Sequence, residues 1–295
     1  MKQLYLVDAS IYIFRAWFSM DESIVDPQGR PVNAVYGFAH FLLQLLQRAQ
    51  PTHASILFDE SLDLSFRNKI YPAYKANREP APEELKYQFG LCRELCRAVG
   101  LHETASVEYE ADDLIGSLAQ LFRRDDNKMI IVSRDKDLVQ VLQGNDEFWD
   151  FAENRRLNLD AAEAHYGIRP DQVADFLALA GDSVDNIPGV KGVGKKTAQI
   201  LLQHYDSLEH VYQNLDAIPD LELRGAKRIG GLLLQYRDDA FMSQKLTRIK
   251  MDIPLKVIKE DLRWQPEPLK VKQFFETLGV GNNLADRFLQ LGSRM

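Results

Sequence analysis

Acidic residues follow three short apolar runs of this sequence, and their spacing suggests a site for metal ions. Four acids stand at these ends: Asp8 after residues 3–7, Asp59 after residues 54–58, and Asp135 and Asp137 after residues 128–132. Such runs are typical of parallel strands buried on both faces, and the carboxyl ends of parallel strands share one edge of a sheet. One such Asp alone is best explained as a helix cap. The repetition favours a common site.

Five further acids lie in two clusters: Glu110, Asp112 and Asp113 at the start of a helical pattern, and Asp182 and Asp185 in a turn-rich loop. Taken singly, the first cluster complements a helix dipole and the second forms turns. Together the nine carboxylates would repel one another unless cations neutralised them. Oxygen ligands without His or Cys favour Mg²⁺ or Mn²⁺ over zinc, and a pair of such ions suits phosphodiester hydrolysis.

The segment Ser65–Arg78 mixes basic and aromatic residues and contains no acid. Its cations are Arg67, Lys69, Lys75 and Arg78, and its tyrosines are Tyr71 and Tyr74. This composition suits a channel for single-stranded nucleic acid, in which phosphates meet the cations and bases stack on the rings. A solvated loop with two half-buried tyrosines is the alternative explanation.

A glycine-rich turn lies between two helical patterns (residues 171–180 and 198–204) and predicts a binding site for the backbone of a DNA duplex. Its members are Gly189, Lys191, Gly192, Gly194, Lys195, Lys196 and Thr197. The glycines permit close approach of a phosphate, and the following helix N-terminus presents amide donors to it. Because a helix rather than a strand precedes the turn, the pattern indicates a helix–hairpin–helix and not a Walker A loop.

The chain has 295 residues and a formal net charge of −7, which excludes a uniformly basic nucleic-acid wrapper. Residues 186–259 nevertheless carry twelve Lys and Arg against eight Asp and Glu. Apolar runs alternate with helical patterns (residues 35–47, 84–99 and 113–123), which predicts an α/β layered fold. Two cysteines, Cys92 and Cys96, and the lack of a membrane-spanning run indicate reduced thiols and a cytoplasmic protein without membrane contact.

These motifs together resemble the bacterial 5′ nucleases, namely the 5′→3′ exonuclease domain of DNA polymerase I and its flap-endonuclease relatives. The resemblance rests on the segments Val7–Ser10 with Arg15, Gly29–Gly37, Phe66–Arg78, Glu110–Gly116, Ser133–Gln140 and Gly181–Ala198. It implies a PIN-like three-layer sandwich around a mainly parallel twisted sheet, with a helix–hairpin–helix (helix-three-turn-helix) subdomain. The expected division is a nuclease domain over residues 1–165, a duplex-binding subdomain over 166–255 and a helical tail over 256–295.

The same resemblance implies the roles of the residues. Asp8, Asp59, Glu110, Asp112 and Asp113 would serve a first metal ion, and Asp135, Asp137, Asp182 and Asp185 a second. A helical arch over about residues 62–86 would admit a single-stranded 5′ end. Lys75 and Arg78 would stabilise charge on the scissile phosphate, while Arg15 and Tyr74 would position and stack the nucleotide. Backbone carbonyls of the hairpin, including those of Val190 and Val193, would bind K⁺.

The expected activity is hydrolysis of DNA at single-strand/duplex junctions, which leaves 5′-phosphate ends. The resemblance implies a free-standing monomer whose partners are DNA with 5′ flaps or ends and proteins of replication and repair. Four residues depart from the usual pattern: Ala9 and Arg134 replace glycine, and Lys191 and Lys195 replace proline. Three alternatives remain open: a DNA-binding scaffold with a silent site, an RNA-processing nuclease, and a dehalogenase-like phosphotransferase, which Ser10 disfavours.

Overall fold

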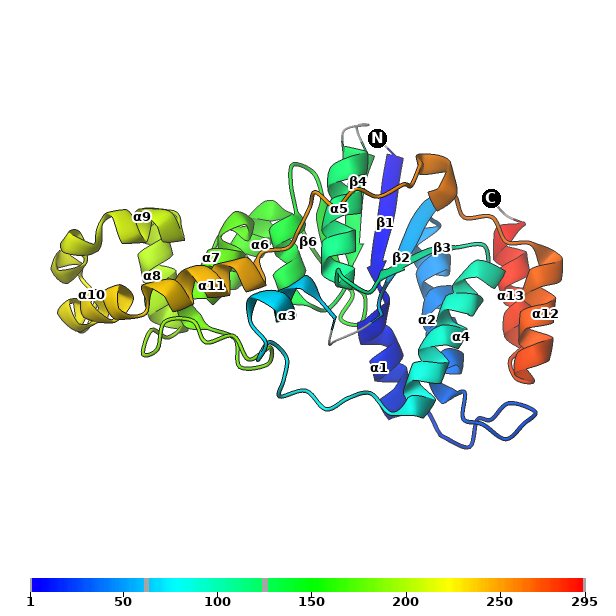
Figure 1. The fold of residues 1–295 in the computed structure, drawn as a ribbon. Coiled ribbons are helices and arrows are strands. Elements are labelled where there is room, and N and C mark those ends of the chain that lie inside the picture. Colours follow the sequence, from blue (N-terminus) through cyan, green and yellow to red (C-terminus); the bar gives the residue numbers. More distant parts are fainter. Residues whose placement is uncertain (1, 61–63, 124–126, 294–295) are drawn as a thin grey trace.

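A six-stranded sheet forms the centre of the computed structural model, which describes residues 2–60, 64–123 and 127–293 (Figure 1). The strand order is β3-β2-β1-β4-β5-β6. The strands are β1 (Lys2–Asp8), β2 (His53–Asp59), β3 (His102–Ser106), β4 (Asn127–Val132), β5 (Glu147–Asp150) and β6 (Arg155–Leu157). Neighbouring strands are parallel from β3 to β5, and β6 pairs antiparallel with β5. The carboxyl ends of β1, β2 and β4 therefore lie at one edge, as predicted.

Helices cover both faces of the sheet. One face carries α1 (Ala9–Ser19), α2 (Asn33–Ala49) and α4 (Glu83–Ala98), and the other carries α5 (Ala111–Arg123), α6 (Leu159–Tyr166) and α7 (Val173–Ala180). Because side chains alternate along a strand, β1 contributes Tyr5 and Val7 to the first core and Leu4 and Leu6 to the second. The predicted three-layer α/β sandwich is confirmed.

A helical subdomain extends from one side of the sheet and has its own apolar core, built from residues between 178 and 240 (Figure 1). It contains α7, α8 (Lys195–Tyr205), α9 (Leu208–Gln213), α10 (Ala226–Gln235) and α11 (Arg237–Thr247), with the 3₁₀ turns η2 (Pro170–Gln172) and η3 (Leu215–Asp220). Helix α11 packs against α7 and returns the chain toward the sheet.

The C-terminal segment packs back on the sandwich. After η4 (Lys259–Leu262) come α12 (Pro268–Leu278) and α13 (Asn282–Gly292), which lie beside α4 and α2. Phe275 and Phe288 enter the first core, so these two helices pack as part of the sandwich. Within the described residues, none of the helices combines the length and apolar character needed to cross a bilayer.

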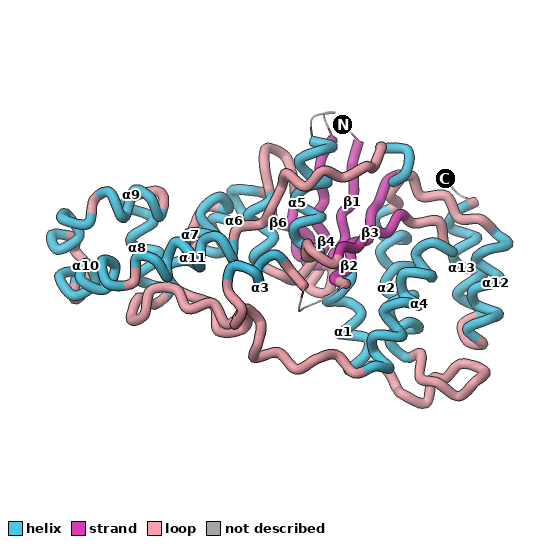
Figure 2. Tube along the Cα trace, viewed as in Figure 1, coloured by secondary structure: helices cyan, strands magenta, loops and turns pink. Residues whose placement is uncertain are grey.

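The predicted arch differs from expectation. Residues 62 and 63 lie outside the described part, and the rest of the segment holds only α3 (Phe66–Ile70) and the start of α4. Between them residues 71–82, called the strap below, form turns and extended chain (Figure 2). Pro72, Pro80 and Pro82 lack the amide that a helix interior needs, which explains the break.

Candidate metal centre and nucleic-acid interface

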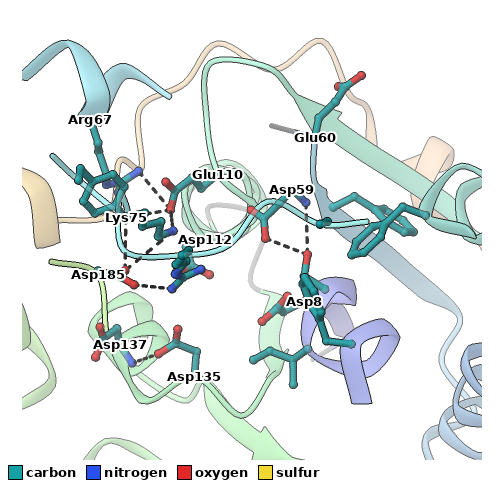
Figure 3. A pocket seen from close by; sticks show the side chains of 18 of the residues that line it. Asp8, Asp59, Glu60, Arg67, Lys75, Glu110, Asp112, Asp135, Asp137 and Asp185 are labelled. Carbon is teal, nitrogen blue, oxygen red and sulfur yellow. Dashed lines mark hydrogen bonds and ion pairs between the residues drawn. The ribbon is translucent and has the colours of Figure 1, made fainter. Parts of the chain in front are cut away.

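The carboxyl edge of the sheet opens into a cavity of about 660 Å³ that gathers most of the predicted acids (Figure 3). Seven of the nine line it: Asp8, Asp59, Glu110, Asp112, Asp135, Asp137 and Asp185. They come from three strand ends, from the start of α5 and from the loop after α7. Residues up to 177 positions apart in the chain thus meet around one space, and the four strand-end acids are among them, as the strand pattern predicted.

Two serine hydroxyls fix the acids of the first two strands. Ser10 Oγ donates to Asp59 Oδ2 at 2.8 Å, and Ser133 Oγ donates to Asp8 Oδ2 at 2.8 Å. Ser133 Oγ also accepts the amide of Asp135 at 3.0 Å, so one buried hydroxyl links two strand ends. The sequence analysis missed both roles, although each serine stands two positions from a predicted acid, which was the available signal.

Burial and mutual repulsion make these carboxylates hard to ionise. Burial, together with the charge of Asp59, raises the pKa of Asp8 to about 7. Burial and Asp135 raise the pKa of Asp137 to about 7. The pKa of Asp112 is raised well above its usual value, first by burial and then by Asp135. A site with this electrostatic character favours cations.

Cations of the strap already lie among the acids. Lys75 Nζ donates to Glu110 Oε2 at 2.7 Å and lies 3.9 Å from Asp185 Oδ2, with only 10% of its side chain exposed. Arg78 pairs with Asp185, and the Tyr74 hydroxyl donates to Glu110 Oε2 at 3.2 Å. Although burial acts to raise the pKa of Glu110, Lys75 and Arg67 outweigh it and lower that pKa.

The strap is fastened to the loop that carries Asp185. The amide of Lys75, whose φ is +56°, donates to Asp185 O at 3.0 Å, and Asn186 Nδ2 donates to Ala73 O at 2.6 Å. Because a non-glycine residue seldom adopts positive φ, these bonds hold Lys75 in a conformation that directs it among the acids.

Three predicted residues lie elsewhere than expected. Asp113 does not line the cavity, since both its oxygens bind the guanidinium of Arg67 at 2.5 and 2.8 Å. Arg67 lines the cavity but is only 3% exposed, and its guanidinium is bound to Asp113 instead of being presented to solvent. Tyr74 is only 4% exposed and offers its hydroxyl to the acids rather than an open ring face for stacking.

The remaining predicted residues lie around the site or outside it. Asp182 is half-buried outside the cavity lining and accepts the amide of Val184 at 2.8 Å. Arg15 is exposed on α1, and Lys69 is exposed and pairs with Glu108 at 3.0 Å. Tyr71 is half-buried against Tyr74.

The donor set of the cavity fits hard divalent ions. Glu110 Oε1 is a buried oxygen with no hydrogen-bond partner within the described residues, and such an atom is costly to leave unsatisfied. Asp137 Oδ1 is also buried and lies 3.3 Å from Lys136 Nζ. In the described part of the chain, no three acid, His or Cys side chains are already gathered closely enough to hold one ion. Glu110 and Asp185 are instead paired with the strap cations Lys75 and Arg78.

The hairpin has the predicted shape. Gly189 has φ +60°, and a Cβ there would lie 2.3 Å from Gly181 N, so only glycine fits. Gly192 has φ +92°, and α8 begins at Lys195 after Gly194. Lys191, Lys195 and Lys196 are exposed, and Thr197 is half-buried. Val190 O accepts the amide of Val193 at 2.9 Å within the turn.

Comparison with known protein families shows which family the chain belongs to. The model of the 5′-3′ exonuclease N-terminal resolvase-like domain matches residues 3–167, and that of the 5′-3′ exonuclease C-terminal SAM fold matches residues 168–269. The chain belongs to the 5′-3′ exonuclease family. As a family member it is a metal-dependent nuclease that acts on DNA, and the resemblance inferred from its motifs is confirmed.

Relatives of this nuclease include both short and long chains. A 5′-3′ exonuclease of Buchnera aphidicola subsp. Schizaphis graminum is 33% identical over 88% of this chain and 91% of its own length. The DNA polymerase I of Caldicellulosiruptor bescii is 34% identical over 98% of this chain, which spans 35% of that polymerase.

Solved structures share the fold. Bacteriophage T5 5′-exonuclease with bound zinc has a TM-score of 0.67 at 21% identity, covering 99% of both chains. The catalytic core of Rad2 in complex with DNA has a TM-score of 0.64 at 16% identity, covering 98% of this chain and 92% of the other.

Proposed function

We propose that this nuclease cuts DNA at single-strand/duplex junctions, as a 5′-3′ exonuclease and a 5′-flap endonuclease that leaves 5′-phosphate ends. The observation that carries the proposal is the cavity at the carboxyl edge of the sheet, where seven carboxylates face basic residues of the strap. Family membership indicates the class of reaction. The carboxylates of the cavity would bind the metal ions, and the basic residues of the strap would bind the phosphate.

Two Mg²⁺ or Mn²⁺ ions suit this cavity. Asp8, Asp59, Glu110 and Asp112 would hold one ion, and Asp135, Asp137 and Asp185 the other, with Asp182 close to the second group. Asp113 leaves the proposed ligand set because Arg67 occupies its carboxylate. When bound, the ions supply charge neutralisation and an activated water for phosphodiester hydrolysis.

When metal ions are bound, the basic residues of the strap would be free to contact the substrate. Lys75 and Arg78 pair with Glu110 and Asp185, and divalent ions would compete for the same oxygens. Once displaced, an ammonium and a guanidinium beside the cavity would stabilise negative charge on a scissile phosphate. We propose this role for both, and a substrate-positioning role for the exposed Arg15.

The hairpin would hold the duplex. Exposed Lys191, Lys195 and Lys196 surround a glycine turn and a helix N-terminus, which together suit a phosphate. We propose that these contacts read the backbone and not the base sequence, with K⁺ held by carbonyls that include those of Val190 and Val193. The proposed domain division at residues 165 and 255 assigns this task to the helical subdomain.

A product-length assay tests the proposal. Blunt, gapped and 5′-flapped duplexes are incubated with the chain across a Mg²⁺ and Mn²⁺ series, and labelled products are sized. We expect cuts near the junction of the flap substrate, abolished by Asp135→Ala or by excess chelator. Cleavage that survives either change would show that the acids of the cavity do not carry the reaction.

A further inference from the structure

Arg67 and Asp113 form the most sequestered ion pair beside the cavity. Arg67 NH1 lies 2.5 Å from Asp113 Oδ2 and NH2 lies 2.8 Å from Oδ1, with the two side chains 3% and 0% exposed. Two parallel N–H···O bonds fix both the distance and the orientation of such a pair. Neither group is free for a metal ion or a phosphate while this pair is intact.

The pair also binds the end of α11. Arg67 Nε donates to Leu246 O at 2.7 Å, and Asp113 Oδ1 accepts the amide of Lys250 at 2.9 Å. Arg67 NH2 reaches Arg248 O at 3.4 Å. Two side chains, one from α3 and one from α5, thus form hydrogen bonds with the backbone of residues 246–250. This segment lies where α11 leaves the helical subdomain.

The other end of this connection is the hairpin. Ser243 on α11 is fully buried, and its Oγ accepts the amide of Gly189 at 3.1 Å. Since Ser243 and Leu246 are less than one helical turn apart, α11 joins the hairpin to the Arg67–Asp113 pair through a single rigid element.

The pair further reaches the acids of the cavity. Asp113 Oδ2 accepts the amide of Glu110 at 3.2 Å, and Arg67 NH1 lies 3.9 Å from Glu110 Oε2. Asp112, which lines the cavity, precedes Asp113 in the same helical turn. The pair is therefore in contact with the acid-bearing start of α5 and with the element that holds the hairpin, and Arg67 belongs to α3, directly before the strap.

We propose that Arg67 and Asp113 are a positioning pair that fixes the hairpin relative to the acids and so sets which phosphodiester is cut. This inference rests on the proposed function. Because successive nucleotides of one strand are spaced by about 3.4 Å, a shift of α11 of that order moves the cut by one nucleotide. Weakening the Arg67–Asp113 pair should increase the fraction of cuts at neighbouring phosphodiesters without removing a metal ligand.

The test uses a variant that leaves no unpaired buried charge. Arg67→Met with Asp113→Leu removes both charges at once and keeps apolar volume, a type of replacement that folded proteins commonly tolerate. Arg67→Lys keeps the charge but cannot form the two parallel bonds, and so provides a second, milder variant. Asp112→Asn, one residue away on the same helix, is the matched control for loss of a proposed ligand.

Four quantities are measured for each chain: the thermal unfolding transition, Mn²⁺ affinity by titration calorimetry, affinity for a 5′-flap duplex by fluorescence anisotropy, and the product lengths from the same duplex carrying an end label. We expect both pair variants to bind Mn²⁺ within about twofold of the wild type and to yield neighbouring products at severalfold higher fractions. Asp112→Asn should lose Mn²⁺ affinity by tenfold or more.

Two results would overturn the positioning role. Loss of Mn²⁺ affinity in the double variant equal to that of Asp112→Asn would make Asp113 a ligand. Unchanged product lengths in both pair variants would likewise rule out the positioning role, and weaker flap-duplex binding in the same variants would make Arg67 a DNA contact. A wild-type chain that binds Mn²⁺ but leaves the flap intact would overturn the proposed function, and the positioning role with it.

Discussion

Replacing Lys75 by Ala should destabilise the metal-free chain, because Lys75 neutralises carboxylates that are out of water. Its Nζ lies 2.7 Å from Glu110 Oε2, and the two side chains are 10% and 9% exposed. Removing one partner of a buried pair costs about 3–5 kcal/mol, and the nearby Arg67 places the expected loss at the lower end, about 3 kcal/mol. For a chain of this size we expect Tm to fall by about 6 °C.

Lys86→Ala is the matched control. Lys86 Nζ lies at the same distance, 2.7 Å, from Glu83 Oε1, but the two side chains are 54% and 85% exposed. An exposed pair contributes at most about 1 kcal/mol, so we expect Tm to change by no more than about 2 °C.

Both variants and the wild type are melted in chelator and again with excess Mg²⁺, with unfolding followed by circular dichroism. Added Mg²⁺ should reduce the deficit of Lys75→Ala, because a divalent ion then neutralises the same carboxylates. Equal Tm shifts for Lys75→Ala and Lys86→Ala in chelator would refute the burial argument. A deficit that Mg²⁺ leaves unchanged would refute the assignment of those carboxylates to metal ions.

Three further predictions concern the acids and the hairpin. The raised pKa values of Asp8 and Asp137, about 7 each, mean that the folded metal-free chain holds more protons than the unfolded one between about pH 4 and 7. Stability in chelator should therefore fall as pH rises through that window, and a Tm series that rises instead would contradict the shifts. Gly189→Ala should lower Tm and weaken duplex binding at least tenfold, since its Cβ would lie 2.3 Å from Gly181 N. Gly194→Ala meets open space in the free chain and should match the wild type in Tm. Lys195→Ala should weaken binding equally for unrelated duplex sequences and reduce the slope of log affinity against log salt by about 1 in filter-binding assays; a sequence-dependent loss would contradict backbone recognition.

The sequence predicted those parts of the structure that depend on the pattern of neighbouring residues. Continuous apolar runs marked β1, β2 and β4, and a strand end followed by Asp marked the edge at which Asp8, Asp59 and Asp135 meet. In contrast, β3 has the sequence HETAS, in which every residue is half-buried at the edge of the sheet, so no apolar run revealed it.

Local sequence patterns could not predict which side chains far apart in the chain bind one another. The acids Glu110, Asp112 and Asp113 look alike in sequence, but α5 directs Asp112 to the cavity and Asp113 to Arg67. Which acid pairs with an arginine 46 positions away depends on how α3 packs against α5 and the end of α11. Basic residues of the strap were likewise expected to meet DNA, whereas Lys75 and Arg78 lie against Glu110 and Asp185.

The most direct test of the metal centre is an anomalous-scattering map from crystals of this chain grown with Mn²⁺. Two peaks should lie inside the cavity, one among Asp8, Asp59 and Asp112 and one among Asp135, Asp137 and Asp185, with Lys75 moved away from Glu110. A cavity without manganese, in crystals of a chain that still cleaves flapped DNA, would contradict the proposed role of these carboxylates.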